Sequence, residues 1–158
     1  MAKTQEQKKI TNDLVHTIET LQAMTEGLGE VQLRTRPEEN KWSIKEIVAH
    51  LAAFERVMVA RLKAMLTTDN PAIERYDTLA WAAVDHIEED IDENLQKFII
   101  ARKKTTDLLK KLKDKDWLRT GRHSEYQNYT IQKAAELLDA HDRNHLKQIE
   151  NIKKRFGS

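Results

Sequence analysis

The sequence contains no cysteine, only 2 prolines and 4 glycines, and few aromatic side chains among its 158 residues. The absence of cysteine excludes disulfide bonds, thiolate metal ligands and a cysteine nucleophile. No apolar run approaches the ~20 residues of a membrane-spanning helix. The polar stretch MAKTQEQKKITNDL lacks the apolar segment of a secretion signal. These absences predict a cytoplasmic protein with few interruptions to its helices.

The sequence also lacks an excess of either positive or negative charge. The chain has 27 basic and 26 acidic residues, which gives a formal net charge of +1. This balance indicates neither a nucleic-acid nor a membrane partner. Hydrophobic residues make up 39% and charged residues 34% of the chain. A composition rich in strong helix formers and poor in breakers predicts a single all-α domain over residues 1–158.

Four segments carry apolar residues at the three- and four-residue spacing of amphipathic helices. Two of them have an N-terminal capping residue: Ser43, followed three residues later by Glu46, and Thr130. Four such helices in one domain favour a four-helix bundle. The expected helices cover residues 4–28, 43–66, 87–112 and 131–152.

The connections between the last three helices are long. Residues 67–86 and 114–129 are poorly periodic, and both are long enough to cross the bundle. A crossover topology is therefore permitted, although the spacing alone does not require one.

Two histidines occupy apolar positions of the last helix. His141 and His145 are four residues apart, so they lie one helical turn apart on one face. His50, in the second helix, falls on or beside the inward face. His50 lies ~10 Å from the start of its helix and His145 ~13 Å from the end of its own. If these helices are antiparallel neighbours, the three imidazoles meet at one level.

Three neutral imidazoles can hold a divalent metal and leave a coordination position open to water or substrate. The alternative is three unrelated core histidines, each hydrogen-bonded to a carbonyl or a water. Of the other histidines, we expect His16 to lie on the surface and His86 to be solvated beside its acidic neighbours.

Three residues are weaker candidates for a substrate pocket. Arg102 occupies a core position, where it could reach water, pair with a buried glutamate or bind an anionic substrate. His123 and Tyr126 lie in the second long connection and could overhang the histidines. Glu55 follows His50 but faces about half a helical turn away, so no general base is identified.

KWSIKEIVAHLAAFE, at residues 41–55, and YTIQKAAELLDAHDRNHLKQI, at residues 129–149, together resemble the DinB-like (YfiT-like) metal-dependent four-helix proteins. The shared pattern is a Trp-Ser helix start with a histidine seven residues after the serine, and an H-x-x-x-H pair in the last helix. The chain matches it at Trp42, Ser43, His50, His141 and His145.

This resemblance implies an up-down-down-up bundle, a homodimer, and a divalent metal such as zinc or nickel on His50, His141 and His145. It also implies activity on a small molecule, either hydrolysis or transfer of a low-molecular-weight thiol. A non-catalytic protein that binds or sequesters small molecules for stress protection is the alternative. A helical interaction module without metal is a third reading.

Overall fold

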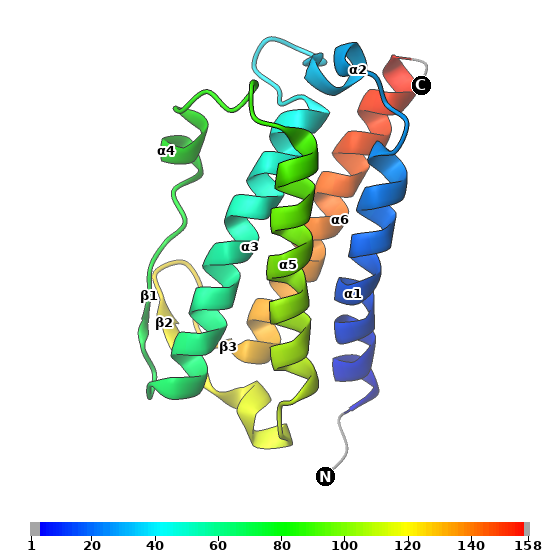
Figure 1. Cartoon of the computed structure of the whole chain (residues 1–158). Helices are drawn as coiled ribbons and strands as arrows, with labels where there is room; N and C mark the ends of the chain where they lie inside the picture. Colours follow the sequence, from blue (N-terminus) through cyan, green and yellow to red (C-terminus); the bar gives the residue numbers. More distant parts are fainter. Residues whose placement is uncertain (1–3, 157–158) are drawn as a thin grey trace.

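The computed structural model describes residues 4–156 and contains four long helices arranged as a bundle (Figure 1). The helices begin and end close to the predicted positions, except that the first ends earlier and the third begins later. They are α1 (Gln5–Thr25), α3 (Ile44–Thr67), α5 (Ile91–Lys110) and α6 (Ile131–Arg155). The all-α prediction of a four-helix bundle is confirmed.

Side chains define the helix starts. The Ser43 hydroxyl accepts a hydrogen bond from the Glu46 amide at 3.2 Å, and the Glu46 carboxylate accepts one from the Ser43 amide at 2.9 Å. This reciprocal capping box satisfies two backbone donors that a helix end leaves free. Thr130 caps α6 in the predicted way, accepting from the Lys133 amide at 3.0 Å. Asp90 caps α5, which is why that helix begins at Ile91 and not near Ile87.

The helices follow the up-down-down-up order. In Figure 1, α1 and α6 ascend while α3 and α5 descend. Around the bundle, α3 contacts both α5 and α6, and α1 contacts both of them from the other side. The helices that carry the three histidines, α3 and α6, are therefore antiparallel neighbours.

Only one of the two long connections crosses the bundle. Because α3 and α5 are parallel, the chain after α3 must return along the outside before α5 can begin, and Figure 1 shows it doing so through β1 (Ala72–Ile73) and α4 (Thr78–Ala82). The connection from α5 to α6 starts and finishes at the same end of the bundle. It contains the 3-10 helix η1 (Asp114–Leu118), β2 (Thr120–His123) and β3 (Tyr129–Thr130).

The three short strands form a small sheet in the order β1-β2-β3. β1 pairs parallel to β2, and β2 pairs antiparallel to β3. The strands are two to four residues long, too short for an alternating pattern that the sequence would reveal. They tie the two long connections together against the side of α3. A further short helix, α2 (Glu30–Arg34), was also not predicted.

Apolar side chains from all four long helices fill the bundle in two clusters. One surrounds Leu14, Met65 and Trp117, and the other surrounds Leu21, Ile47 and Phe98. Over residues 4–156, no helix combines the length and the apolar character needed to cross a bilayer.

Candidate metal centre

The structure brings His50, His141 and His145 together, as the helical spacing predicts. One ring nitrogen from each residue lies within 4.8 Å of the other two. The Nε2 atoms of His50 and His141 are 3.1 Å apart. His50 and His145 are buried and His141 is partly exposed. Within the described chain, no other group of three histidine or carboxylate side chains converges in this way.

The outer nitrogens of His50 and His145 have partners that orient these two rings. Nδ1 of His145 donates to the side-chain oxygen of Gln148 at 2.9 Å, which leaves Nε2 with the free lone pair. Nδ1 of His50 lies 3.5 Å from the Tyr76 hydroxyl. His50 and His141 also present Nε2 to the centre, because these two atoms lie 3.1 Å apart. Such outer contacts fix ring orientation in metal sites.

The donor set fits a divalent transition metal. Two nitrogens bound to one tetrahedral ion at 2.0–2.1 Å lie about 3.3 Å apart, close to the 3.1 Å between His50 and His141. The widest separation, 4.8 Å, exceeds the ~4 Å that two such bonds can span, so one ring would have to move closer for all three to bind one ion. The buried Nδ1 of His141 has no hydrogen-bond partner among the residues described.

Burial keeps these imidazoles neutral. Desolvation, together with the neighbouring imidazoles, lowers the pKa of His50 and of His141 to about 3. The pKa of His145 is also lowered by burial, although its bond to Gln148 opposes the shift. Neutral imidazole is the form that binds a metal. At neutral pH all three rings therefore have the protonation state that a metal site needs.

Aromatic rings enclose the centre. Trp42, the residue before the α3 cap, stacks on His145 with ring centroids 6.2 Å apart and lies 4.9 Å from His50. Trp81 of α4 packs edge-on against both Trp42 and His50. Tyr76, from the same crossing connection, lies 5.7 Å from His50. Sequence reasoning missed Tyr76, because nothing in its local spacing indicates that the connection folds back over α3.

A cavity of about 510 Å³ opens beside the histidines. It falls within the usual size of small-molecule sites. The predicted pocket residues His123 and Tyr126 do line it, from β2 and the turn after it. Two arginines that the sequence did not single out, Arg61 and Arg75, also line it.

Arg102 does not line this cavity, so its interpretation as a substrate-pocket residue is wrong. The guanidinium is completely buried and donates two hydrogen bonds to Glu55 and two to Asp142, all at 2.7–2.8 Å. A fifth bond goes to the Leu14 carbonyl at 2.9 Å. All five of its donors are thus used inside the bundle. Of the alternatives considered for Arg102, the structure shows pairing with a buried glutamate, Glu55.

The expectation for His86 was also wrong. Its ring stacks on Trp81 at 3.9 Å, and only 12% of the side chain is exposed. Nε2 lies 2.7 Å from the Trp81 carbonyl oxygen, and Nδ1 contacts Glu89. His86 therefore supports the aromatic cover of the centre. His16 is exposed, as predicted.

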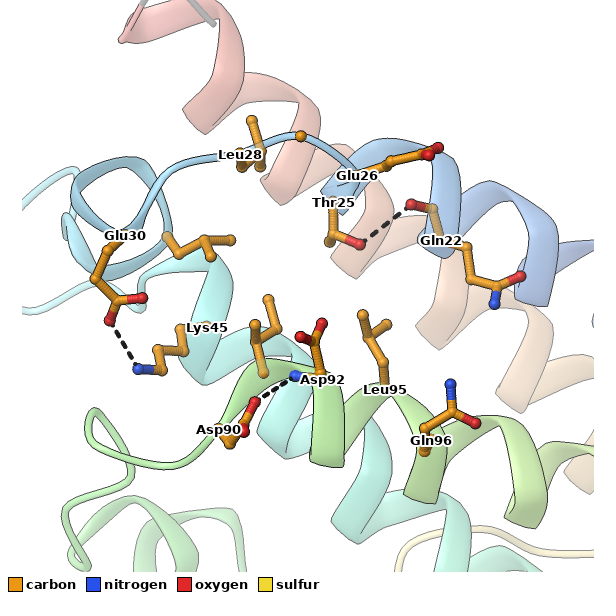
Figure 2. Close-up of a pocket in the computed structure, with 13 residues that line it drawn as sticks. Gln22, Thr25, Glu26, Leu28, Glu30, Lys45, Asp90, Asp92, Leu95 and Gln96 are labelled. Atoms are coloured by element: carbon orange, nitrogen blue, oxygen red, sulfur yellow. Dashed lines mark hydrogen bonds and ion pairs between the residues drawn. The ribbon is translucent and has the colours of Figure 1, made fainter.

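A larger cavity, of about 930 Å³, lies elsewhere, where α1, α2, α3 and α5 meet (Figure 2). Half of its polar side chains are acidic, and its one cation, Lys45, is paired with Glu30 at 3.0 Å. None of the three histidines lines it. The larger cavity is therefore separate from the chemistry that the histidines allow.

Fold and site together define a four-helix bundle with a three-histidine cluster beside a cavity of about 510 Å³. The sequence pattern of the DinB superfamily matches residues 13–149. The chain belongs to the DinB superfamily.

Similar proteins agree with this assignment. The "Putative metal-dependent hydrolase OB0782" of Oceanobacillus iheyensis is 29% identical over 150 residues, covering 92% of this chain and 87% of the relative. The "Putative metal-dependent hydrolase YfiT" of Bacillus subtilis is 28% identical over 139 residues, covering 87% of this chain and 78% of the relative.

A solved structure has the same architecture. It is described as "YfiT from Bacillus subtilis is a probable metal-dependent hydrolase with an unusual four-helix bundle topology". It matches with a TM-score of 0.89 at 26% identity, covering 99% of this chain and 91% of that one.

Proposed function

We propose that this protein is a metal-dependent hydrolase that uses His50, His141 and His145 to hold a divalent transition metal. The observation that carries the proposal is the convergence of three neutral ring nitrogens within 4.8 Å beside a cavity of about 510 Å³. The naming of the relatives as metal-dependent hydrolases supports it. Zinc and nickel are the proposed ions, because imidazole suits both.

The three histidines would hold a divalent ion, which would supply Lewis acidity and a lowered pKa for a water or thiol bound there. The chain's own residues hold the ligands and shape the site. Gln148 fixes the orientation of His145, and Tyr76 contacts His50. Burial raises the pKa of Tyr76 to about 12, so its hydroxyl stays protonated and can donate a hydrogen bond to a substrate in the cavity.

A second candidate function is the transfer of a low-molecular-weight thiol to a small electrophile. It is favoured by a second hollow of about 550 Å³, which shares Trp42 and His145 with the first cavity. Two hollows that meet at one centre suit a reaction of two substrates. The chain has no cysteine, so the sulfur would come from the second substrate. A homodimer, implied by the family resemblance, remains a prediction for size-exclusion chromatography with light scattering.

The first test is elemental analysis of the purified protein and of two histidine variants. We expect about one equivalent of transition metal in the wild type and in His16→Ala, since His16 is exposed and outside the centre. His50→Ala should retain little metal while circular dichroism still reports a helical protein. Full metal occupancy in His50→Ala would overturn the proposal.

Turnover distinguishes the candidate functions. A hydrolase releases acid from model esters or amides without added thiol, whereas a thiol transferase needs both a thiol and an electrophile and obeys two-substrate kinetics. In either case activity should require the metal and be lost in His50→Ala. A protein that binds metal and ligand stoichiometrically, but turns over neither class of substrate, would be the non-catalytic binding protein.

A further inference from the structure

Arg61 is a half-buried cation. It lies on α3, on the same helical face as His50, and it lines the cavity. Its Nη2 donates to the Glu74 carbonyl oxygen at 2.8 Å, and Nη1 lies 3.9 Å from the sulfur of Met58. Its Nε is buried and has no hydrogen-bond partner among residues 4–156.

The contrast with Arg102 shows what Arg61 lacks. Arg102 is neutralised by two carboxylates and uses all of its donors. Arg61 makes no ion pair with any carboxylate in the described part of the chain. All of its hydrogen-bond partners there, Tyr129 included, are neutral. A partly desolvated cation without a counter-ion is costly, because water no longer solvates it fully. An anion supplied from the cavity would offset that cost.

The surroundings of Arg61 place its charge inside the cavity. Burial lowers the pKa of His123, and the neighbouring Arg61 cation lowers it further. Burial raises the pKa of Tyr129, and contact with Arg61 opposes that shift. Both of these neighbours line the same cavity. The other arginine there, Arg75, already pairs with Glu125 at 2.8 Å.

We infer that the substrate is a small carboxylate whose anionic group binds Arg61 while its reactive group lies at the three histidines. A single uncompensated cation suits a monoanion. The body between the two ends should be apolar or aromatic, because Phe54, Met58 and Leu138 line that part of the cavity. The position of the reactive group rests on the proposed function, whereas the carboxylate site at Arg61 does not.

The helix limits the length of such a substrate. Eleven residues separate His50 from Arg61, which places their Cα atoms about 16 Å apart along the axis. The Arg61 guanidinium contacts the sulfur of Met58, which lies about one helical turn nearer to His50. The carboxylate and the reactive group are therefore separated by less than about 16 Å.

The test compares a carboxylate with a neutral molecule of the same shape. The probes are 4-phenylbutyrate and 4-phenylbutyramide, titrated into the metal-free full-length protein by calorimetry. The wild type should prefer the carboxylate by about tenfold or more, as expected for a charge-assisted hydrogen bond. Arg61→Gln should lose this preference. Arg56→Gln, which removes the same charge from an exposed position of α3, should keep it.

Two controls keep the result interpretable. Thermal melts establish that each variant is folded. If Arg61→Gln does not fold, Arg61→Lys replaces it as the test variant. Because it retains the charge, Arg61→Lys should keep part of the carboxylate preference. Equal binding of the two probes by the wild type, a preference that survives in Arg61→Gln, or no binding of either probe in the millimolar range would overturn the inference.

Metal uptake separates this inference from the proposed function. Arg61→Gln should take up metal as the wild type does. Loss of the carboxylate preference with normal metal uptake supports both proposals. If the protein prefers the carboxylate but binds no metal, the proposed function is refuted and the inference that Arg61 is an anion site still holds.

Discussion

Replacement of Arg102 by methionine should be among the most destabilising single changes in this protein. The substitution keeps an unbranched side chain in the core but removes all five hydrogen bonds of the guanidinium. Two carboxylates, each about 1% exposed, would remain in the bundle. Glu55 would keep only its bond from the Thr105 hydroxyl, and Asp142 only its bond from the Thr17 hydroxyl.

The size of the effect follows from this arrangement. Removal of one partner of a buried ion pair costs about 3–5 kcal/mol, because the other charge stays buried without compensation. Native proteins are stable by about 5–15 kcal/mol in total. For a chain of this length, each kcal/mol lowers Tm by roughly 2–4 °C. We therefore expect Arg102→Met to lower Tm by about 10 °C, measured by thermal and urea unfolding.

Arg143→Met is the matched control. Arg143 lies on α6 with 67% of its side chain exposed, and it pairs with Asp139 at 3.3 Å. Asp139 is only 12% exposed, but the Arg143 guanidinium remains in water, so the pair should contribute about 1 kcal/mol or less. Arg102→Lys, which keeps the charge but loses the planar fork, should fall between the two. The reasoning is refuted if Arg102→Met costs no more than Arg143→Met.

Three further changes test other parts of the structure. Ser43→Ala should cost about 1 kcal/mol in urea unfolding, because it removes the α3 cap; an unchanged midpoint would contradict the capping role. Gly121→Ala would place a Cβ atom 2.7 Å from the Ile73 side chain and should cost about 1–3 kcal/mol. Part of that loss should return in Gly121→Ala/Ile73→Val, and no recovery would exclude the steric cause. Burial lowers the pKa of His86, but its contacts with Glu89 and the Trp81 carbonyl outweigh this and raise it above 6.5. Its contribution to stability is therefore complete below pH 6.5 and is lost as the pH rises through the folded value. The stability difference between wild type and His86→Gln should shrink from pH 6 to pH 8, and a difference that grows would contradict the assignment.

The helical periodicity of apolar residues was the most informative signal for the fold. The caps at Ser43 and Thr130 and the spacing of His141 and His145 are local features, so a single sequence reveals them. That His50 lies close to His141 and His145 could be predicted from the distance of each histidine to the end of its helix. The predictions for these residues were correct because helix geometry converts sequence distance directly into spatial distance.

The rest depends on contacts distant in sequence. Arg102 pairs with residues 47 and 40 positions away, and no local pattern indicates which carboxylates it meets. His86 looks solvated among acidic neighbours, yet its ring stacks on Trp81. Tyr76 and Arg61 enter the cavity only because the crossing connection returns along α3. The path of such a connection is decided by packing, which periodicity does not encode.

The parallel arrangement of α3 and α5 has a consequence for how this protein can change over evolution. The three histidines stand on two packed helices, where most substitutions disturb the core. Tyr76, His123 and Tyr126 stand instead on connections outside the bundle, which tolerate substitution and insertion more readily. Under the proposed function, substrate preference can therefore diverge by mutation of the connections while the three histidines are inherited intact. One scaffold of this kind can serve different reactants in different descendants.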